Sequence, residues 1–230
     1  MSTLGQFCFS TLALRQEYRI LAKQLAGNLE QYAPRVTLVV GTDRPDDFQA
    51  CSNVWAFKLE QQGILHCYHD KRFVLEQALT RFRTAIQIDA DSQIVGALPS
   101  ELDQATGLSA IHVENLLDHV ERYTPQRLSH LAKVAEKLNI SLESASYIGE
   151  ALFAVSAEGD KTVEFIKQWG IIGSYLELHG IHAGEGNAIG LAAAKAGLAI
   201  ANPVWLQAIN QSRIHLDASN KSTAIRPIQI

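Results

Sequence analysis

Two aspartates, Asp89 and Asp91, follow an apolar β-branched run and are the residues of this chain best suited to chemistry. The run, residues 85–88, predicts a buried strand. Side chains at positions i and i+2 of an extended chain point to the same side, and paired carboxylates there suit a hard divalent cation. Such a cation neutralises a diphosphate, so the pair predicts phosphate chemistry through a metal. A strand-terminal aspartate also caps turns and helices, which leaves a structural role open.

Composition narrows the class of protein. The 230 residues, 47% hydrophobic and 19% charged, fit one well-packed soluble domain. The formal net charge of -4 provides no basic field, so we expect no nucleic acid partner. The three cysteines form no Cys-x-x-Cys pair, which argues against disulfides or a thiolate zinc site. A signal-peptide pattern and an apolar run of about 20 residues are both missing, so we expect a cytoplasmic protein without a transmembrane segment.

The first half of the chain alternates between strand and helix patterns. Continuous apolar runs predict strands at residues 7–13, 36–40 and 85–88 and shorter ones at 57–59 and 64–68, and helical spacing predicts helices over 18–29 and 74–82. This order predicts a parallel sheet covered by helices on both faces. Ligands of such sheets bind beyond the carboxyl ends of the strands. We therefore expect Asp43, Asp89 and Asp91 at one shared edge.

The second half has a different pattern. Residues 114–140 predict an inserted helical section or flap, in which no catalytic cluster is apparent. A strand-like pattern returns at 147–155, and helices are expected over 162–169 and 187–196. The tail, residues 212–230, is polar and irregular, and we expect it to close the site. All 230 residues are expected to form one domain.

Four segments in sequence carry a family resemblance: Ser10-Thr11 in the first strand, Gly41-Thr42-Asp43 after the second, Lys71-Arg72 at a helix start, and Asp89-Ala90-Asp91. They resemble the GT-A-fold glycosyltransferases, in the style of the glycogenin-like and blood-group-transferase-like families. The resemblance implies an α/β fold with a mixed, mostly parallel central sheet flanked by helices. It also implies a nucleotide-diphospho-sugar donor bound by Ser10, Thr11, Asp43, Lys71, Asp89 and Lys221, with Asp89 and Asp91 as metal ligands.

Three later segments extend the resemblance. Residues 214–221 resemble a C-terminal signature of a metal-binding histidine and a diphosphate-binding lysine, here His215 and Lys221, without the usual Pro-Trp. Residues 182–187 resemble an acidic loop before a helix, with only Glu185 where a pair of acids is common. Residues 147–154, which include Glu150, resemble the acceptor-side strand without its usual Asn-Ser-Gly or Phe-Gly-Gly.

The chemistry of these residues agrees with the resemblance. When the bond between the sugar and the diphosphate breaks, the nucleoside diphosphate is the leaving group and negative charge develops on it. A metal held by Asp91 and His215, beside Lys221, would stabilise that charge. A histidine ligand favours Mn²⁺ over Mg²⁺. An inverting enzyme also needs a base near the acceptor hydroxyl, and Glu185 or Glu150 could serve. Glu185 could equally be a solvated loop acid, and Glu150 a member of a buried salt bridge.

Other functions compete with this interpretation. A haloacid-dehalogenase-like phosphatase also has a strand followed by Asp-x-Asp, although its motif normally ends the first strand. A nucleotidyltransferase needs a glycine-rich basic loop after its first strand, and residues 10–15 contain no glycine. A catalytically silent sugar-nucleotide-binding protein on the same fold stays open. His179 and His182 form a His-x-x-His pair, but no third ligand is near them in the sequence.

Overall fold

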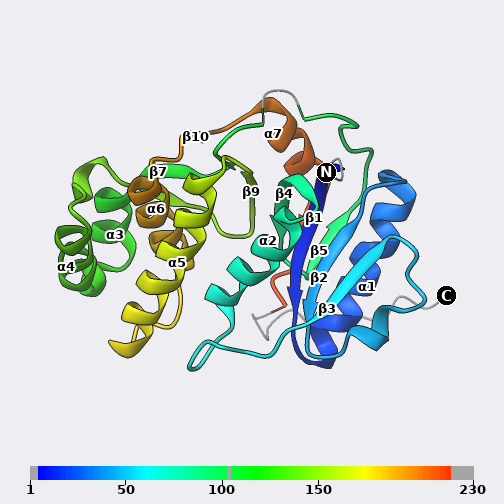
Figure 1. Cartoon of the computed structure of the whole chain (residues 1–230), viewed down its shortest axis with the longest axis horizontal. Helices are drawn as coiled ribbons and strands as arrows, with labels where there is room; N and C mark the ends of the chain where they lie inside the picture. The colour runs from blue at the N-terminus through cyan, green and yellow to red at the C-terminus, as the bar shows by residue number, and fades with distance from the viewer. Residues whose placement is uncertain (1–4, 103–104, 219–230) are drawn as a thin grey trace.

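A seven-stranded sheet forms the centre of the protein, in a computed structural model that describes residues 5–102 and 105–218 (Figure 1). The strands are β1 (Gly5–Ala13), β2 (Leu38–Thr42), β3 (Val54–Lys58), β4 (Phe82–Ile88), β5 (Ser92–Ile94), β6 (Leu108–Ala110), β7 (Val113–Asn115), β8 (Ser146–Ile148), β9 (Leu152–Ser156), β10 (Ile200–Ala201) and β11 (Arg213–His215). The helices are α1 (Arg15–Tyr32), α2 (Lys71–Leu79), α3 (Leu116–Tyr123), α4 (Leu128–Leu138), α5 (Asp160–Leu178), α6 (Glu185–Ala196) and α7 (Val204–Gln211). None of the helices in these described ranges is both long enough and apolar enough to cross a bilayer.

The sheet is mostly parallel, as the alternating pattern predicts. Its strand order is β10-β6-β9-β4-β1-β2-β3. Strand β9 runs antiparallel to both of its neighbours, β4 and β6, while β1 to β4 run parallel. The chain moves from β1 to β2 and β3 on one side and returns to β4 on the other. The gap between the ends of β1 and β4 is therefore a topological switch point, where ligands of such sheets bind.

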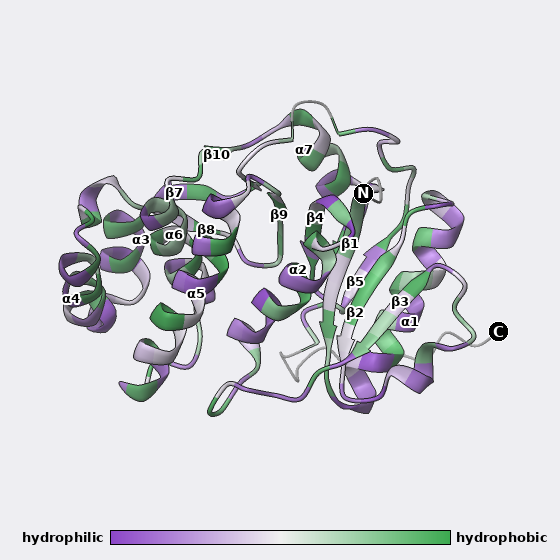
Figure 2. Cartoon of the chain, in the orientation of Figure 1, coloured by the Kyte–Doolittle hydropathy of each residue, from purple (hydrophilic) through white to green (hydrophobic). Residues whose placement is uncertain are grey.

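Alternate residues of the central strands pack into different layers, because successive side chains of a strand face opposite ways. Cys8 and its neighbour on β4, Ala85, belong to a core shared with α2, α5 and α6. Phe9 and Ile86 belong to a second core shared with α1 and α7. Helices α1 and α2 accordingly show both hydrophobic and hydrophilic residues along their length (Figure 2). Burial of both faces explains why β2 consists entirely of buried residues.

The helical section predicted at residues 114–140 contains α3 and α4, which lie with α5 and α6 at one end of the molecule (Figure 1). Two short paired strands, β7 and β8, hold the start and end of this section together. Leu116 and Leu131 place both helices in the same core as α5 and α6. The section is thus packed on the rest of the chain through apolar side chains.

Several predicted elements were wrong in extent. Residues 64–68 form no strand, and Ile64 and Leu65 are exposed in a loop because no strand pairs with them. The helix predicted to reach Phe82 ends at Leu79, and Phe82 begins β4. The helix predicted at 162–169 extends over Asp160–Leu178, since further apolar residues continue its buried face. The tail predicted to be irregular includes β11, which pairs with β5.

The strand predicted at residues 147–155 is in fact two strands in different sheets. Strand β8 pairs with β7, whereas β9 lies in the central sheet. Gly149 begins the turn between them, and a Cβ at this position would lie 2.9 Å from the Cβ of His112. Glu150 therefore lies in the turn just before β9 and not within a strand.

Gly190 permits a close contact between α6 and β8. A Cβ at this position would lie 1.6 Å from the carbonyl oxygen of Ser146. We expect Gly190→Ala to lower the free energy of unfolding by roughly 1–3 kcal/mol, because backbone would have to move. Gly27→Ala in α1 is the matched control: a Cβ at position 27 would have nothing within 4 Å, so the change should stabilise by roughly 0.5–1 kcal/mol. Urea unfolding of both variants checks the packing, and equal effects would contradict it.

Candidate active site

The Asp-x-Asp motif lies in the turn between β4 and β5, at the switch point. Asp89 directly follows β4, and the Ser92 N–H donates to the Asp89 carbonyl at 3.0 Å to close the turn. Strand β5 then pairs with β11, which places His215 opposite Ser92. The Leu216 N–H donates to the Asp91 carbonyl at 2.9 Å. This pairing brings a histidine from the C-terminal region beside the two aspartates.

Asp89, Asp91 and His215 form a cluster that can hold a metal ion, with ligand atoms within 4.8 Å of one another. His215 Nε2 lies 3.2 Å from Asp91 Oδ1 and 3.8 Å from Asp89 Oδ2. The second oxygen of each aspartate is engaged elsewhere: Asp89 Oδ1 by Lys71 and Asp91 Oδ2 by the Ala218 N–H at 2.8 Å. One oxygen of each carboxylate is thus directed toward the imidazole. Two carboxylates and an imidazole are a donor set that can hold a divalent metal ion.

Hydrogen bonds and charges tune the protonation of this cluster. The bond to Asp91 raises the pKa of His215 above its ordinary value. Burial works to raise the pKa of Asp91, but the bonds from His215 and the Ala218 N–H outweigh it and lower the pKa. Burial raises the pKa of Asp89, against the opposing influence of Lys71. Asp91 is therefore the better anionic ligand of the two.

Lys71 links the aspartates to the predicted acidic loop. It is the first residue of α2, it is buried, and its Nζ lies 2.7 Å from Asp89 Oδ1 and 2.8 Å from Glu185 Oε1. Nζ also donates to the Glu150 carbonyl at 3.4 Å. Burial works against its charge, but the charges of Asp89 and Glu185 outweigh burial and raise the pKa of Lys71. The residue is thus a buried ammonium held between carboxylates.

Glu150 and Glu185 have opposite environments although both are buried from solvent to a large extent. Burial, followed by the charge of Glu185, raises the pKa of Glu150 to about 7. Glu150 Oε2 accepts a hydrogen bond from the Tyr147 hydroxyl at 2.7 Å. Burial of Glu185 is outweighed by Lys71, which lowers the pKa of Glu185. Near neutral pH Glu150 can exchange a proton, while Glu185 stays ionised.

A cavity of about 600 Å³ opens beside these residues. The first residues of three helices, Arg15, Lys71 and Glu185, all line it. Helix N-termini carry partial positive charge and favour anions. Arg15 has a φ of 71°, in the left-handed region that residues other than glycine seldom adopt and that often marks functional sites.

Sequence comparison identifies no relative of this chain: no protein-family model matches it, and no curated protein matches it. What the site can do follows from its geometry. The Asp89, Asp91 and His215 cluster can hold a metal ion. The helix starts on the cavity wall favour an anionic group next to that cluster, whereas the Lys71 ammonium is already paired with Asp89 and Glu185.

The residues predicted from the sequence fall into two sets. One set lines the cavity: Lys71, Asp89, Asp91, Glu150, Glu185 and His215. Ser10 and Thr11 are instead buried in β1, where Ser10 Oγ donates to Gln87 Oε1 at 3.1 Å and, among the described residues, Thr11 Oγ1 has no hydrogen-bond partner. Asp43 forms an ion pair with Arg19 at 2.8 Å. Lys221 lies outside the described residues. The donor-binding roles of these last four residues stay predictions.

Sequence reasoning missed several residues of the cavity. Arg213 is the first residue of β11 and lines the cavity. Its guanidinium donates to the Ala151 carbonyl at 3.1 Å. Tyr18 and Tyr68 contribute aromatic surface. Tyr18 fits the helical spacing of the apolar residues that follow it, and this spacing does not indicate that Tyr18 lines a cavity. The proximity of Arg213 to the motif depends on the pairing of β5 with β11, which no local pattern reveals.

Proposed function

We propose that this protein is a metal-dependent glycosyltransferase with a GT-A-like fold, which moves a sugar from a nucleotide-diphospho-sugar to an acceptor. The observation that carries the proposal is the meeting of Asp89, Asp91 and His215 at the switch point of a mostly parallel sheet. The antiparallel strand β9 agrees with the mixed sheet that the GT-A resemblance implies.

The metal would be Mn²⁺, held by Asp89, Asp91 and His215. Its chemistry would be electrostatic stabilisation of the diphosphate that leaves when the bond to the sugar breaks. The protein residues prepare the same place for an anion. Leu14, the N-cap residue directly before α1, makes no side-chain capping hydrogen bond among the described residues, and it lines the cavity together with Arg15. The first N–H groups of α1 are therefore suited to bind phosphate oxygens.

The cavity also suits the remainder of a donor molecule. Its volume of about 600 Å³ lies within the range of small-molecule sites. Tyr18 and Tyr68 line it, and aromatic rings of this kind can stack on a nucleotide base. Lys71 fixes Asp89 and Glu185 in place, so the ligand-facing carboxylates keep one arrangement before the donor binds.

Glu150 is the better candidate for accepting the proton of an acceptor hydroxyl. Glu150 lines the cavity, and a pKa of about 7 suits proton transfer near neutral pH. Glu185 is held ionised by Lys71 and serves to fix that lysine. Different surroundings separate the pKa values of the two acids, so one can transfer a proton while the other stays ionised.

Transfer should depend on pH through Glu150. The carboxyl group must be deprotonated to act as base, so the rate should rise as the pH increases through about 7. Glu150→Gln should lower the rate at pH 8 by about 100-fold and remove this rise. Glu136→Gln on the exposed side of α4 is the control and should leave the profile unchanged. A pH profile that survives in Glu150→Gln would assign the base elsewhere.

The products formed from a panel of nucleotide sugars and phosphate monoesters, each with Mn²⁺, test the proposed function and its rivals together. A glycosyltransferase should release a nucleoside diphosphate from one nucleotide sugar, by transfer or by slow hydrolysis. A haloacid-dehalogenase-like phosphatase would release inorganic phosphate from phosphate esters. A silent binding protein would bind a nucleotide sugar and release nothing. Only the first outcome, lost in Asp91→Asn, supports the proposal.

A further inference from the structure

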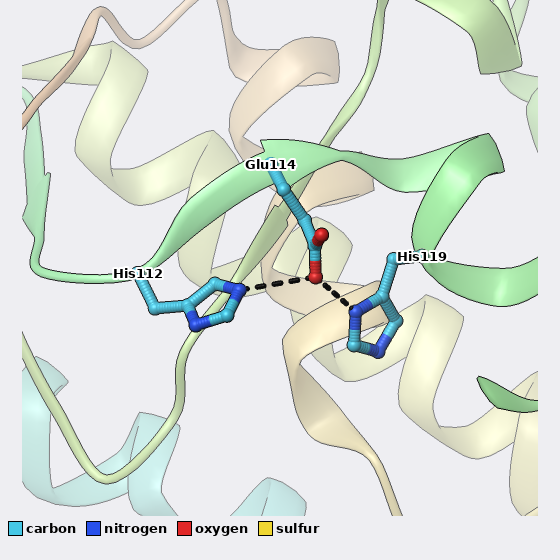
Figure 3. Close-up of side chains that lie close together, drawn as sticks. All are labelled: His112, Glu114 and His119. Atoms are coloured by element: carbon cyan, nitrogen blue, oxygen red, sulfur yellow. Dashed lines mark hydrogen bonds and ion pairs between the residues drawn. The ribbon is translucent and has the colours of Figure 1, made fainter. Parts of the chain in front are cut away.

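A second cluster of possible metal ligands lies outside the aspartate cluster and contains two histidines. His112, Glu114 and His119 place their ligand atoms within 4.8 Å of one another. Figure 3 shows both imidazoles directed at the same carboxylate oxygen of Glu114. His112 Nε2 lies 3.0 Å from Glu114 Oε1, and His119 Nδ1 lies 2.5 Å from it. Neither the Asp-x-Asp motif nor the proposed reaction uses these three residues.

The backbone of this segment prepares the arrangement. His112 directly precedes β7 and Glu114 lies within it, two residues on, so their side chains leave the chain on the same side. The Gly149 N–H donates to the His112 carbonyl at 2.9 Å, which fixes the chain next to the turn after β8. Asn115 caps α3 by accepting from the Asp118 N–H at 3.1 Å. The cap sets where the first turn of α3 begins and thereby places His119.

Tyr147 fixes both rings. The imidazole of His119 stacks on the Tyr147 ring with centroids 3.5 Å apart and planes within 8°. The imidazole of His112 meets the same ring edge-on, at 5.6 Å and 86°. Glu114 and Tyr147 are direct partners in the β7–β8 ladder, which explains why all four side chains share one face. The ring orientations are thus set by packing as well as by the carboxylate.

We propose that His112, Glu114 and His119 form a zinc site. Two imidazoles and one carboxylate are a ligand set found in zinc proteins that keep a fourth position open. Zinc bonds to nitrogen and oxygen of about 2.0–2.2 Å require ligand atoms a few ångströms apart, as these are. The site differs in chemistry from the aspartate cluster, which has more oxygen ligands and suits a harder cation.

The cluster lies next to the cavity, so the open coordination position of a bound zinc ion would be accessible from it. His112 lines the 600 Å³ cavity and is itself exposed to solvent. Tyr147 touches both histidines and also donates to Glu150 at 2.7 Å. A zinc ion here would lie at the cavity rim, with its fourth position available to water or to an anionic group of a bound molecule. It would not need the donor or Mn²⁺ for binding.

Zinc titration in an Asp91→Asn background tests the site, because that change weakens the aspartate cluster. The metal-stripped protein is titrated with Zn²⁺ against a coloured chelator, and with Co²⁺, whose visible absorption reports four-coordinate binding. We expect one Zn²⁺ per chain. Adding His112→Gln or Glu114→Gln should weaken binding at least about tenfold. Adding His179→Gln, a matched change of a histidine outside the cluster, should leave binding unchanged.

Because His112 is exposed, its replacement should not unfold the protein, so a loss of Zn²⁺ binding in His112→Gln can be assigned to the lost ligand. Circular dichroism of each variant checks that the fold is kept. Equal Zn²⁺ affinity in the His112→Gln, Glu114→Gln and His179→Gln proteins would overturn the proposal, as would no binding in the parent Asp91→Asn protein. The cluster would then be an ion pair between histidines and a glutamate. Because Asp91 is already removed, this result is independent of whether the protein transfers sugars.

Discussion

Replacing Lys71 by methionine is expected to lower the free energy of unfolding by about 3–5 kcal/mol, the range seen when one partner of a buried ion pair is removed. Lys71 Nζ lies within 2.8 Å of both Asp89 and Glu185. Without it, Asp89 and Glu185 face each other as uncompensated charges in a buried site, and both must be protonated or hydrated for the chain to fold. Equilibrium unfolding in urea measures the loss.

The surface offers a matched control for this change. Lys58 pairs with Glu60 at 2.6 Å, but both side chains are more than half exposed. Lys58→Met should therefore change the stability by less than about 1 kcal/mol. The double variant Lys71→Met with Glu185→Gln should recover part of the loss, because one of the two unpaired charges is removed. If Lys71→Met and Lys58→Met behave alike, the described role of Lys71 is wrong.

Replacing Asp91 by asparagine is expected to weaken Mn²⁺ binding by at least about 100-fold, since even the loss of an outer partner of a metal ligand weakens binding roughly 10- to 100-fold. Asparagine has nearly the same shape, and its amide oxygen can still accept from the Ala218 N–H. The change removes a charge next to His215 and leaves the backbone pairing in place. Titration of free Mn²⁺ by electron paramagnetic resonance measures the affinity.

Measuring the free energy of unfolding of Asp91→Asn shows whether weaker Mn²⁺ binding comes from the lost ligand or from a less stable fold. The ion pair between Asp91 and His215 involves a partly exposed imidazole, so its loss should lower the free energy of unfolding by no more than about 1 kcal/mol. Asp46→Asn, at an exposed position of a short 3₁₀ helix, is the control and should keep the parent affinity for Mn²⁺. Unchanged Mn²⁺ affinity in Asp91→Asn would remove Asp91 from the metal site.

Much of the sheet could be predicted from the sequence because its strands are buried on both faces. Such strands appear as continuous apolar runs, and the runs predict β1, β2 and β4 at nearly their observed positions. Elements whose identity depends on distant partners were missed. The tail strand β11 exists because β5 is available to pair with it, and the apparent strand at 147–155 is split because its halves pair with different partners.

The candidate site shows the same division between local and distant information. Asp89 and Asp91 could be found because two aspartates two residues apart, directly after an apolar run, are a local pattern, although they lie in the turn after β4 and not on a strand. The sequence also places Lys71 at a helix start, but its burial between two carboxylates depends on α6, which begins more than a hundred residues later. The pairing of Glu114 with His112 and His119 likewise depends on the cap of α3 and on the stacking of Tyr147. Periodicity predicts elements, whereas side-chain clusters arise from tertiary packing.

The most direct test of the proposed function is a thermal-shift panel of UDP, GDP, CDP and ADP, each with and without Mn²⁺. A ligand that binds the native state raises the melting temperature by mass action. We predict that one of the four raises it only when Mn²⁺ is present, and that Asp91→Asn abolishes the rise. A protein whose melting temperature responds to none of them, or responds equally without Mn²⁺ and without Asp91, would contradict a metal-dependent nucleotide-sugar site.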